Sequence, residues 1–176
     1  MKRILKTFIV AAGFGLLPAA AQADTFLLIS GIAGDSSDPA HKNWIRVSSL
    51  SWGAFMPATN SSDGGFGAAF SAKSAPVVLT IPTGTWSREF LNNLTRGIYL
   101  PQVIIDHVNP DGRPAYRATF NNFLVTKYLN APAAKAQAQD EVEGAFGSYK
   151  IEFFTVGADG RITSTSSGWN FVANTP

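Results

Sequence analysis

Short apolar and alternating runs, divided by turn residues, dominate the chain and predict β-strands. Thr25 to Ile29 is a nearly continuous apolar run, which is typical of a strand buried on both faces. Turn residues at Asn109–Gly112 and Ala158–Gly160 mark reversals of the chain. Further strands are predicted at residues 43–52, 77–81, 99–108, 116–120, 123–129, 147–156 and 169–172.

The strand predicted at residues 43–52 changes phase midway, at Ser48 and Ser49. Its apolar residues lie on one face before this point and on the opposite face after it. Such a change indicates a bulge or a sharp bend, which lets one strand serve two sheets or turn a barrel corner. The residues on the two faces are Ile45 and Val47 before the bend, and Leu50 and Trp52 after it.

One helix is predicted between Thr85, which can cap it, and Gly97, which is well placed to end it. Its apolar face has the spacing of a helix that packs on a core, and we interpret the aromatic residues there as core residues. That face consists of Trp86, Phe90 and Leu94, widened by Leu91.

Residues 53–75 form the longest region without a clear pattern, and a loop of this length in a compact domain is usually functional or disordered. A second break is expected at Asn121–Asn122, and residues 131–139 read as a loop or a weak helical turn. With no repeat and no linker, the chain after the leader is predicted to be one all-β domain, a barrel or sandwich with a single α-helix.

Residues 1–23 have the three parts of a secretory signal peptide. A basic start precedes an apolar core, and Ala21-Gln22-Ala23 fits the small-x-small cleavage pattern. The apolar core is shorter than the ~20 residues that a transmembrane helix needs. We therefore expect cleavage after Ala23, export to the periplasm or medium, and no stable membrane insertion.

The net charge and the cysteine content limit which partners the protein can bind and how its fold can be stabilised. The chain has a formal charge of +2, and removing the three basic residues of the leader leaves −1. Charge this small and scattered does not predict nucleic-acid binding. Because there is no cysteine, an exported chain must be held together by its core rather than by disulfides.

No constellation of catalytic residues stands out. His41 follows two aspartates, but no second histidine or cysteine is near it, so a solvated turn histidine is the favoured reading. His107 lies on the apolar face of a strand, where a packed or edge position is favoured. No serine sits in a G-x-S-x-G elbow. We predict no enzymatic activity, no metal and no cofactor, and function is then expected to lie in exposed edges and a long loop suited to self-assembly.

The residues Ile29–Ile32, Gly34–Ser36, His41–Val47 and Ser51–Gly53 resemble the start of the haemolysin-coregulated protein (Hcp) family, the tube proteins of type VI secretion systems. The likeness continues in order through nearly all of the chain after the leader. It includes the Gly-rich loop, the helix, the paired strands and a late Gly168-Trp169-Asn170.

The resemblance implies a small β-barrel of two packed antiparallel sheets with one helix, in which six copies form rings and rings stack into a tube that carries effector proteins. It places Asn60, Ser61, Asp63, Gly64, Gly65, Phe66 and Gly67 in an inter-ring loop. It assigns Trp44, Ile45, Val47, Ser48, Ser49, Trp52 and Gly53 to the core or the bend.

The leader departs from the family pattern, because tube subunits assemble in the cytoplasm. Three readings stay open besides an exported ring-forming protein. They are a true type VI tube subunit, a periplasmic binding module that keeps the fold without assembly, and an enzyme on this fold, which has the least support.

Overall fold

The computed structural model describes residues 23–60, 66–68, 71–132 and 136–176, so the predicted leader lies outside it except for its last residue. Eleven strands and one helix follow one another within the described residues. Their bounds are β1 (Asp24–Ile29), β2 (Ile45–Arg46), β3 (Ser49–Phe55), β4 (Ala58–Asn60), β5 (Phe66–Ala68), β6 (Lys73–Pro82), α1 (Ser87–Arg96), β7 (Tyr99–Val108), β8 (Pro114–Ala131), β9 (Gln139–Ala145), β10 (Ser148–Val156) and β11 (Ile162–Asn170).

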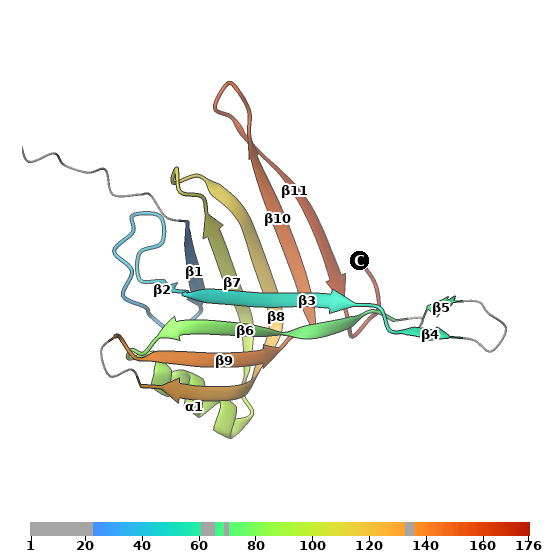
Figure 1. The fold of residues 1–176 in the computed structure, drawn as a ribbon, viewed down its shortest axis with the longest axis horizontal. Coiled ribbons are helices and arrows are strands. Elements are labelled where there is room, and N and C mark those ends of the chain that lie inside the picture. The colour runs from blue at the N-terminus through green and yellow to red at the C-terminus, as the bar shows by residue number, and fades with distance from the viewer. Residues whose placement is uncertain (1–22, 61–65, 69–70, 133–135) are drawn as a thin grey trace, which may run out of the picture.

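Nine of these strands form one antiparallel sheet that folds back on itself into two halves (Figure 1). One half has the order β2-β1-β7-β8-β10-β11, and the other has the order β8-β9-β6-β3. Apolar side chains from both halves and from α1 form a single core. The predicted class, all-β with two packed antiparallel sheets and one helix, is therefore confirmed. Within the described residues the strand ladder ends at β2, β3 and β11 and does not close, so the predicted barrel is an open one.

Strand β8 is long and bent, and it belongs to both halves of the sheet. Residues 116–121 of β8 pair with β10, whereas residues 124–131 pair with β9. Between them Asn122 has a φ of 53°, a left-handed conformation that asparagine tolerates better than most residues. The sequence predicts two strands with a break at Asn121–Asn122, whereas β8 is one continuous strand that bends at Asn122. This bend is one corner of the fold.

The second corner lies between β2 and β3, where the sequence predicts a bend. The Val47 N–H donates to the Thr25 carbonyl of β1 at 2.8 Å, and the next N–H, that of Ser48, donates to the Thr80 carbonyl of β6 at 2.8 Å. The chain thus passes from one half of the sheet to the other within two residues. The predicted bend is confirmed one residue earlier than expected, and apolar residues on both sides of it reach the core.

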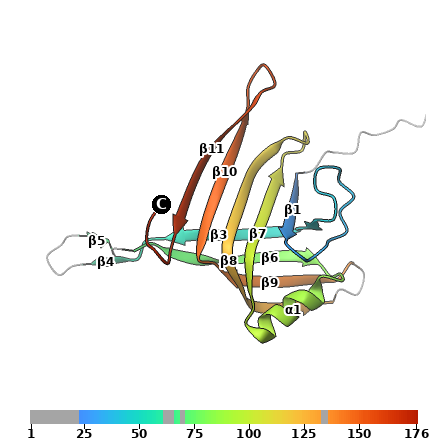
Figure 2. The same ribbon diagram turned by 180° about the vertical axis from the view of Figure 1, so that it is seen from behind.

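Helix α1 covers the end of the second half (Figure 2) and differs from the prediction at its start. Trp86, not Thr85, is the N-cap residue, and no side chain caps it. Instead, the Ser87 hydroxyl accepts a hydrogen bond from the Gly84 N–H and donates one to Asp140, which is fully buried. Phe90 is buried as predicted, whereas Leu91 is 46% exposed and does not widen the face. Gly97 ends the helix at a φ of 61°, as expected.

The strand β9 is absent from the sequence prediction, although its buried and half-buried residues alternate. Two further stretches have more strand than their sequence predicts. β3 continues to Phe55 and β6 begins at Lys73, and between them β4 and β5 pair as a hairpin. The last strand, β11, begins at Ile162, whereas the sequence predicts only residues 169–172. Both corrections have one cause. These strands are short or largely exposed, so no alternation of apolar residues marks them.

Gly144 of β9 leaves space for the ring of Phe123, which is fully buried. A Cβ at Gly144 would overlap that ring, and an overpacked core site costs about 1–3 kcal/mol. We expect Gly144→Ala to lower the free energy of unfolding by this amount in urea denaturation. Gly53→Ala is the matched control, because a Cβ there meets nothing within 4 Å. Equal stability of the two variants would contradict this account of the core.

Candidate functional site

Within the described residues three strands lie at the ends of the sheet, β2, β3 and β11. β2 has two residues and continues through the second corner into β3, so β3 and β11 are the long edges. Within the described residues, β11 pairs only with β10, and β3 pairs only with β6. Figure 1 shows that the two edges border the same open side of the molecule. An unpaired edge presents a row of N–H and C=O groups that can template another strand. The open seam between β3 and β11 is therefore a candidate assembly surface.

The sequence of β11 lacks the usual protection of an edge strand. Its nine residues, ITSTSSGWN, include no charge and no proline, and the first six side chains are exposed. Serine and threonine leave the backbone accessible while keeping the strand soluble. This edge is the functional feature that the sequence analysis missed, and the signal available in the sequence was the absence of charge from residues 162–170.

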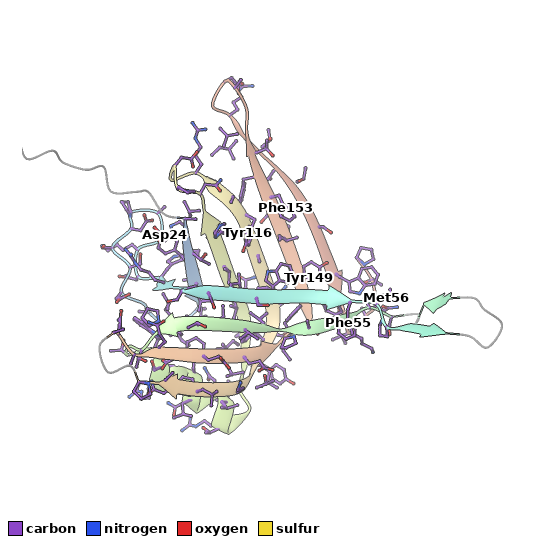
Figure 3. All side chains as sticks on the ribbon, in the orientation of Figure 1. Asp24, Phe55, Met56, Tyr116, Tyr149 and Phe153 are labelled. Carbon is purple, nitrogen blue, oxygen red and sulfur yellow. The ribbon has the colours of Figure 1, made fainter. Side chains whose placement is uncertain are left out.

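A groove of about 260 Å³ lies between these strands at the base of the β4–β5 hairpin. Phe55 and Met56, which are about half exposed, lie beside one another there in Figure 3. The indole N–H of Trp169 is buried beside it and has no hydrogen-bond partner among the described residues. The groove therefore adds an exposed apolar contact to the edge. Its lining is Ala54, Met56, Ala72, Tyr149, Ser167, Gly168, Trp169 and Phe171.

A row of aromatic side chains crosses the inner face of the first half above β3 (Figure 3). His107, Tyr116 and Phe153 are successive cross-strand neighbours, with ring centroids 5.2 and 6.3 Å apart. The Thr25 hydroxyl lies 2.8 Å from His107 Nδ1, so the packed position predicted for His107 is confirmed. Burial raises the pKa of the Tyr116 phenol. Phe153 is 50% exposed, so the row of aromatic side chains ends at the solvent-exposed surface.

The predicted inter-ring loop is only partly described. The β4–β5 hairpin projects beyond the end of β3 (Figure 1), and its backbone pairs Asn60 with Phe66 and Thr59 with Gly67. Ser61, Asp63, Gly64 and Gly65 lie outside the described residues. The hairpin reaches away from the core that holds the rest of the chain, as an assembly arm would.

The residues assigned to the core or the bend lie at the second corner. Trp52 contacts Phe120 and Tyr149 with ring centroids 5.1 and 5.3 Å away. Trp44 packs its ring edge against His41. The other members are Ile45, which is fully buried, Val47, which is 9% exposed, Ser48 and Ser49, which are exposed, and Gly53 within β3.

His41 is a buried residue, so the expectation of a solvated turn histidine is wrong. It is 8% exposed and stacks on Phe26 with ring centroids 4.2 Å apart. Its Nδ1 lies 2.8 Å from Asp38 Oδ1, and its Nε2 lies 3.2 Å from Asp106 Oδ2. β1 is buried on both faces. The loop that carries His41 covers Phe26, which lies on the face away from the core.

Asp106 joins this histidine to an arginine on β8. The Arg117 guanidinium donates to both carboxylate oxygens of Asp106, at 2.6 and 2.7 Å. The hydrogen bond to Asp106 raises the pKa of Arg117, and burial opposes it. The hydrogen bond from His41 lowers the pKa of Asp38. We call Asp38, His41, Asp106 and Arg117 the histidine network.

The histidine network does not have the layout of a catalytic site. Both ring nitrogens of His41 face carboxylates, so neither is free to take a proton from a nucleophile. Within the described parts of the chain, no group of three histidine, cysteine or acidic residues could hold a metal ion. The geometry therefore shows His41 binding its loop to the sheet through both ring nitrogens.

The fold and its open edges define a class of protein, the β-sandwich subunits with one helix and a projecting hairpin. The sequence matches the family described as "Type VI secretion system effector, Hcp" over residues 26–153. The chain therefore belongs to the Hcp family of the type VI secretion system.

Solved structures agree with this assignment of the fold. Hcp1 from Salmonella typhimurium is 24% identical with a TM-score of 0.74, and the match covers 88% of this chain and 98% of Hcp1. A structure titled as a type six secretion system protein is 20% identical with a TM-score of 0.75, covering 86% and 98%. Hcp2 from Salmonella typhimurium is 22% identical with a TM-score of 0.66, covering 87% and 99%. The comparison with curated protein sequences gave no match.

Removing the guanidinium of the histidine network should destabilise the protein. Arg117→Met leaves Asp106, which is 7% exposed, with His41 as its remaining partner in the network. We expect a loss of about 2 kcal/mol in urea denaturation, less than for a fully buried pair because the arginine side chain is 42% exposed. Arg161→Met is the control, because that side chain is 86% exposed and should change stability by less than about 0.5 kcal/mol. Equal losses in both variants would contradict the argument.

Proposed function

We propose that this protein is a non-enzymatic subunit of an Hcp ring, exported through its leader, and that its rings stack into a tube that can escort effector proteins. Membership of the Hcp family supports the tube. The observation that carries the proposal is the open seam between β3 and β11, which leaves two free edges on one chain. Two different surfaces on each subunit are what a closed ring requires.

Lateral contact in the ring is assigned to the edges. Pairing β11 with a strand of the next copy satisfies its free backbone groups, and the exposed ring of Phe153 and the groove at Met56 become buried. Hexamers are the expected closed form, as the resemblance to Hcp implies.

Contact between rings is assigned to the β4–β5 hairpin with residues 60–67. The hairpin projects from the body along the direction of β3, away from the core (Figure 1). It can therefore reach a neighbouring ring without disturbing the core of its own chain. Asn60, Ser61, Asp63, Gly64, Gly65, Phe66 and Gly67 are the residues proposed for this contact.

Export rests on residues 1–23, whose sequence has the basic, apolar and small-residue parts of a signal peptide. No helix within the described part of the chain has the length and apolarity to cross a bilayer. We propose that the mature protein begins at Asp24, the first residue of β1. The folded domain is then complete without the leader.

Introducing a charge at the β11 edge tests lateral contact. Ser166 is exposed and lies opposite Glu152 in the strand register, so Ser166→Lys should leave the monomer folded. We expect this variant to shift the hexamer toward monomer by about tenfold or more in light scattering, because a lysine on an edge opposes strand addition.

Thr95→Lys is the matched control for this test, because Thr95 is exposed on α1, far from both edges (Figure 2). Intact rings in the β11 variant would rule out the edge as the lateral surface. A wild-type chain that stays monomeric at high concentration would instead favour the alternative, a periplasmic binding module that keeps the fold without assembly.

Shortening the hairpin tests contact between rings. Replacing residues 60–67 by an Asn-Gly turn keeps the β3–β6 pairing and removes the arm. We expect single rings of unchanged size and a loss of stacked rings in electron micrographs. Stacking equal to that of the wild type would show that the hairpin is not the inter-ring contact.

Mass spectrometry of the N-terminus tests export. A protein expressed from the full sequence should start at Asp24 and appear in the periplasmic or secreted fraction, because a signal peptide is removed during export. A protein that keeps Met1 and stays in the cytoplasm would overturn export while leaving the ring proposal intact. Alteration of Ala21 and Ala23 to bulky residues should block cleavage.

A further inference from the structure

Residues 31–44, which we call the histidine loop, cover the outer face of the sheet. Phe26 is 3% exposed although it lies on the face opposite the core residues Leu27 and Ile29. His41 stacks on it with an angle of 1° between the ring planes. The start of the loop is fixed by Ile32, which belongs to the core and bonds to Ile29, and the rest of the loop is held on the sheet by this aromatic contact and by the charged groups beside it.

The loop folds tightly upon itself before it meets the sheet. The Gly34 N–H donates to the Asn43 carbonyl, and the Ser36 N–H donates to the Trp44 carbonyl. Asp38 accepts hydrogen bonds from two backbone N–H groups as well as facing His41. The part of the loop after Ile32, residues 33–44, is thus bonded within itself, so it can close on the sheet or open from it while Ile32 stays in the core.

The two contacts of His41 require a particular protonation state of its ring. A carboxylate only accepts hydrogen bonds, so each of the two contacts needs a hydrogen on the ring nitrogen that makes it. Neutral imidazole carries one such hydrogen, and imidazolium carries two. With a neutral ring, either Asp38 or Asp106 would face a nitrogen lone pair at 2.8 or 3.2 Å.

The charges around His41 also favour the doubly protonated ring, the imidazolium. The groups that face the network are Asp38 in the loop, Asp106 on β7, Arg117 on β8, Glu152 opposite Arg117 on β10, and Arg46 opposite Phe26 on β2. The network contains two negative carboxylates and one positive guanidinium. A protonated His41 adds a second positive charge, so the net charge of the network is then zero. Loss of that proton leaves a net negative charge where Asp106 is 7% exposed.

We propose that the histidine network is a proton-dependent latch, which holds the histidine loop on the sheet while both ring nitrogens of His41 carry protons and releases it when one proton is lost. The latch is closed where both carboxylates are ionised and the ring carries two protons, and it opens when a rise in pH removes one ring proton. It goes beyond ring formation, because it acts within one chain. The released surface is the outer face at Phe26 and Asp106.

Two measurements on the purified protein test the latch together. Nitrogen-15 spectra of labelled histidine report which ring nitrogens are protonated, and His107→Gln assigns the signals of His41. Hydrogen exchange of the backbone amides reports loop opening, as protection factors corrected for the pH dependence of intrinsic exchange. We expect both nitrogens to be protonated where the loop is closed, and protection over residues 33–44 to fall about tenfold or more as one proton is lost.

Two variants separate the latch from general unfolding. Asp38→Asn keeps an oxygen acceptor and removes one negative charge at a partly exposed position, so loop opening should move to lower pH. His41→Gln has no titrating ring, so protection over residues 33–44 should no longer change with pH across this range. Amides of β7 and β8 should keep their protection in both variants, which distinguishes local opening from loss of the fold.

The proposal is overturned by either of two results. One is a neutral His41 ring in the protein while the histidine loop is fully protected. The other is loop protection that stays constant across the titration of His41, or that changes equally in His41→Gln.

Discussion

The structure depends on one constraint, that a single antiparallel sheet must fold back on itself to bury its apolar face. Two corners achieve this. At one, the N–H groups of Val47 and Ser48 bond to opposite halves of the sheet. At the other, Asn122 bends β8 so that it pairs first with β10 and then with β9. The core, the helix position and the open seam all follow from these two corners.

The corners also leave the sheet open. Of its terminal strands within the described residues, β3 and β11 are the long ones, one in each half. Closing the ladder would remove both edges and with them the means of pairing with another copy. The chain buries its own core while β3 and β11 keep free backbone groups at the edges of the sheet, as the proposed ring contacts require.

Part of this fold was predictable from the sequence, namely the features that are marked by residues close together along the chain. The bend at Ser48 and the break at Asn122 were predicted because a change of phase and a pair of asparagines are local signals. The role of His41 was predicted wrongly, because Asp106 is 65 residues away along the chain and local sequence does not show what a loop covers. The edge strand β11 was missed because a strand exposed on both faces has no apolar period.

The sequence by itself determined the all-β class, the single helix with its end at Gly97, the bend and the likeness to Hcp. Periodicity, glycine conformation and motif order depend on near neighbours, so they can be read along the chain. Only the tertiary structure decided which edges stay open, that the region after Gly53 forms a hairpin, and that His41 joins Asp38 to Asp106. These features depend on residues that are distant in sequence and meet only when the sheet folds back on itself.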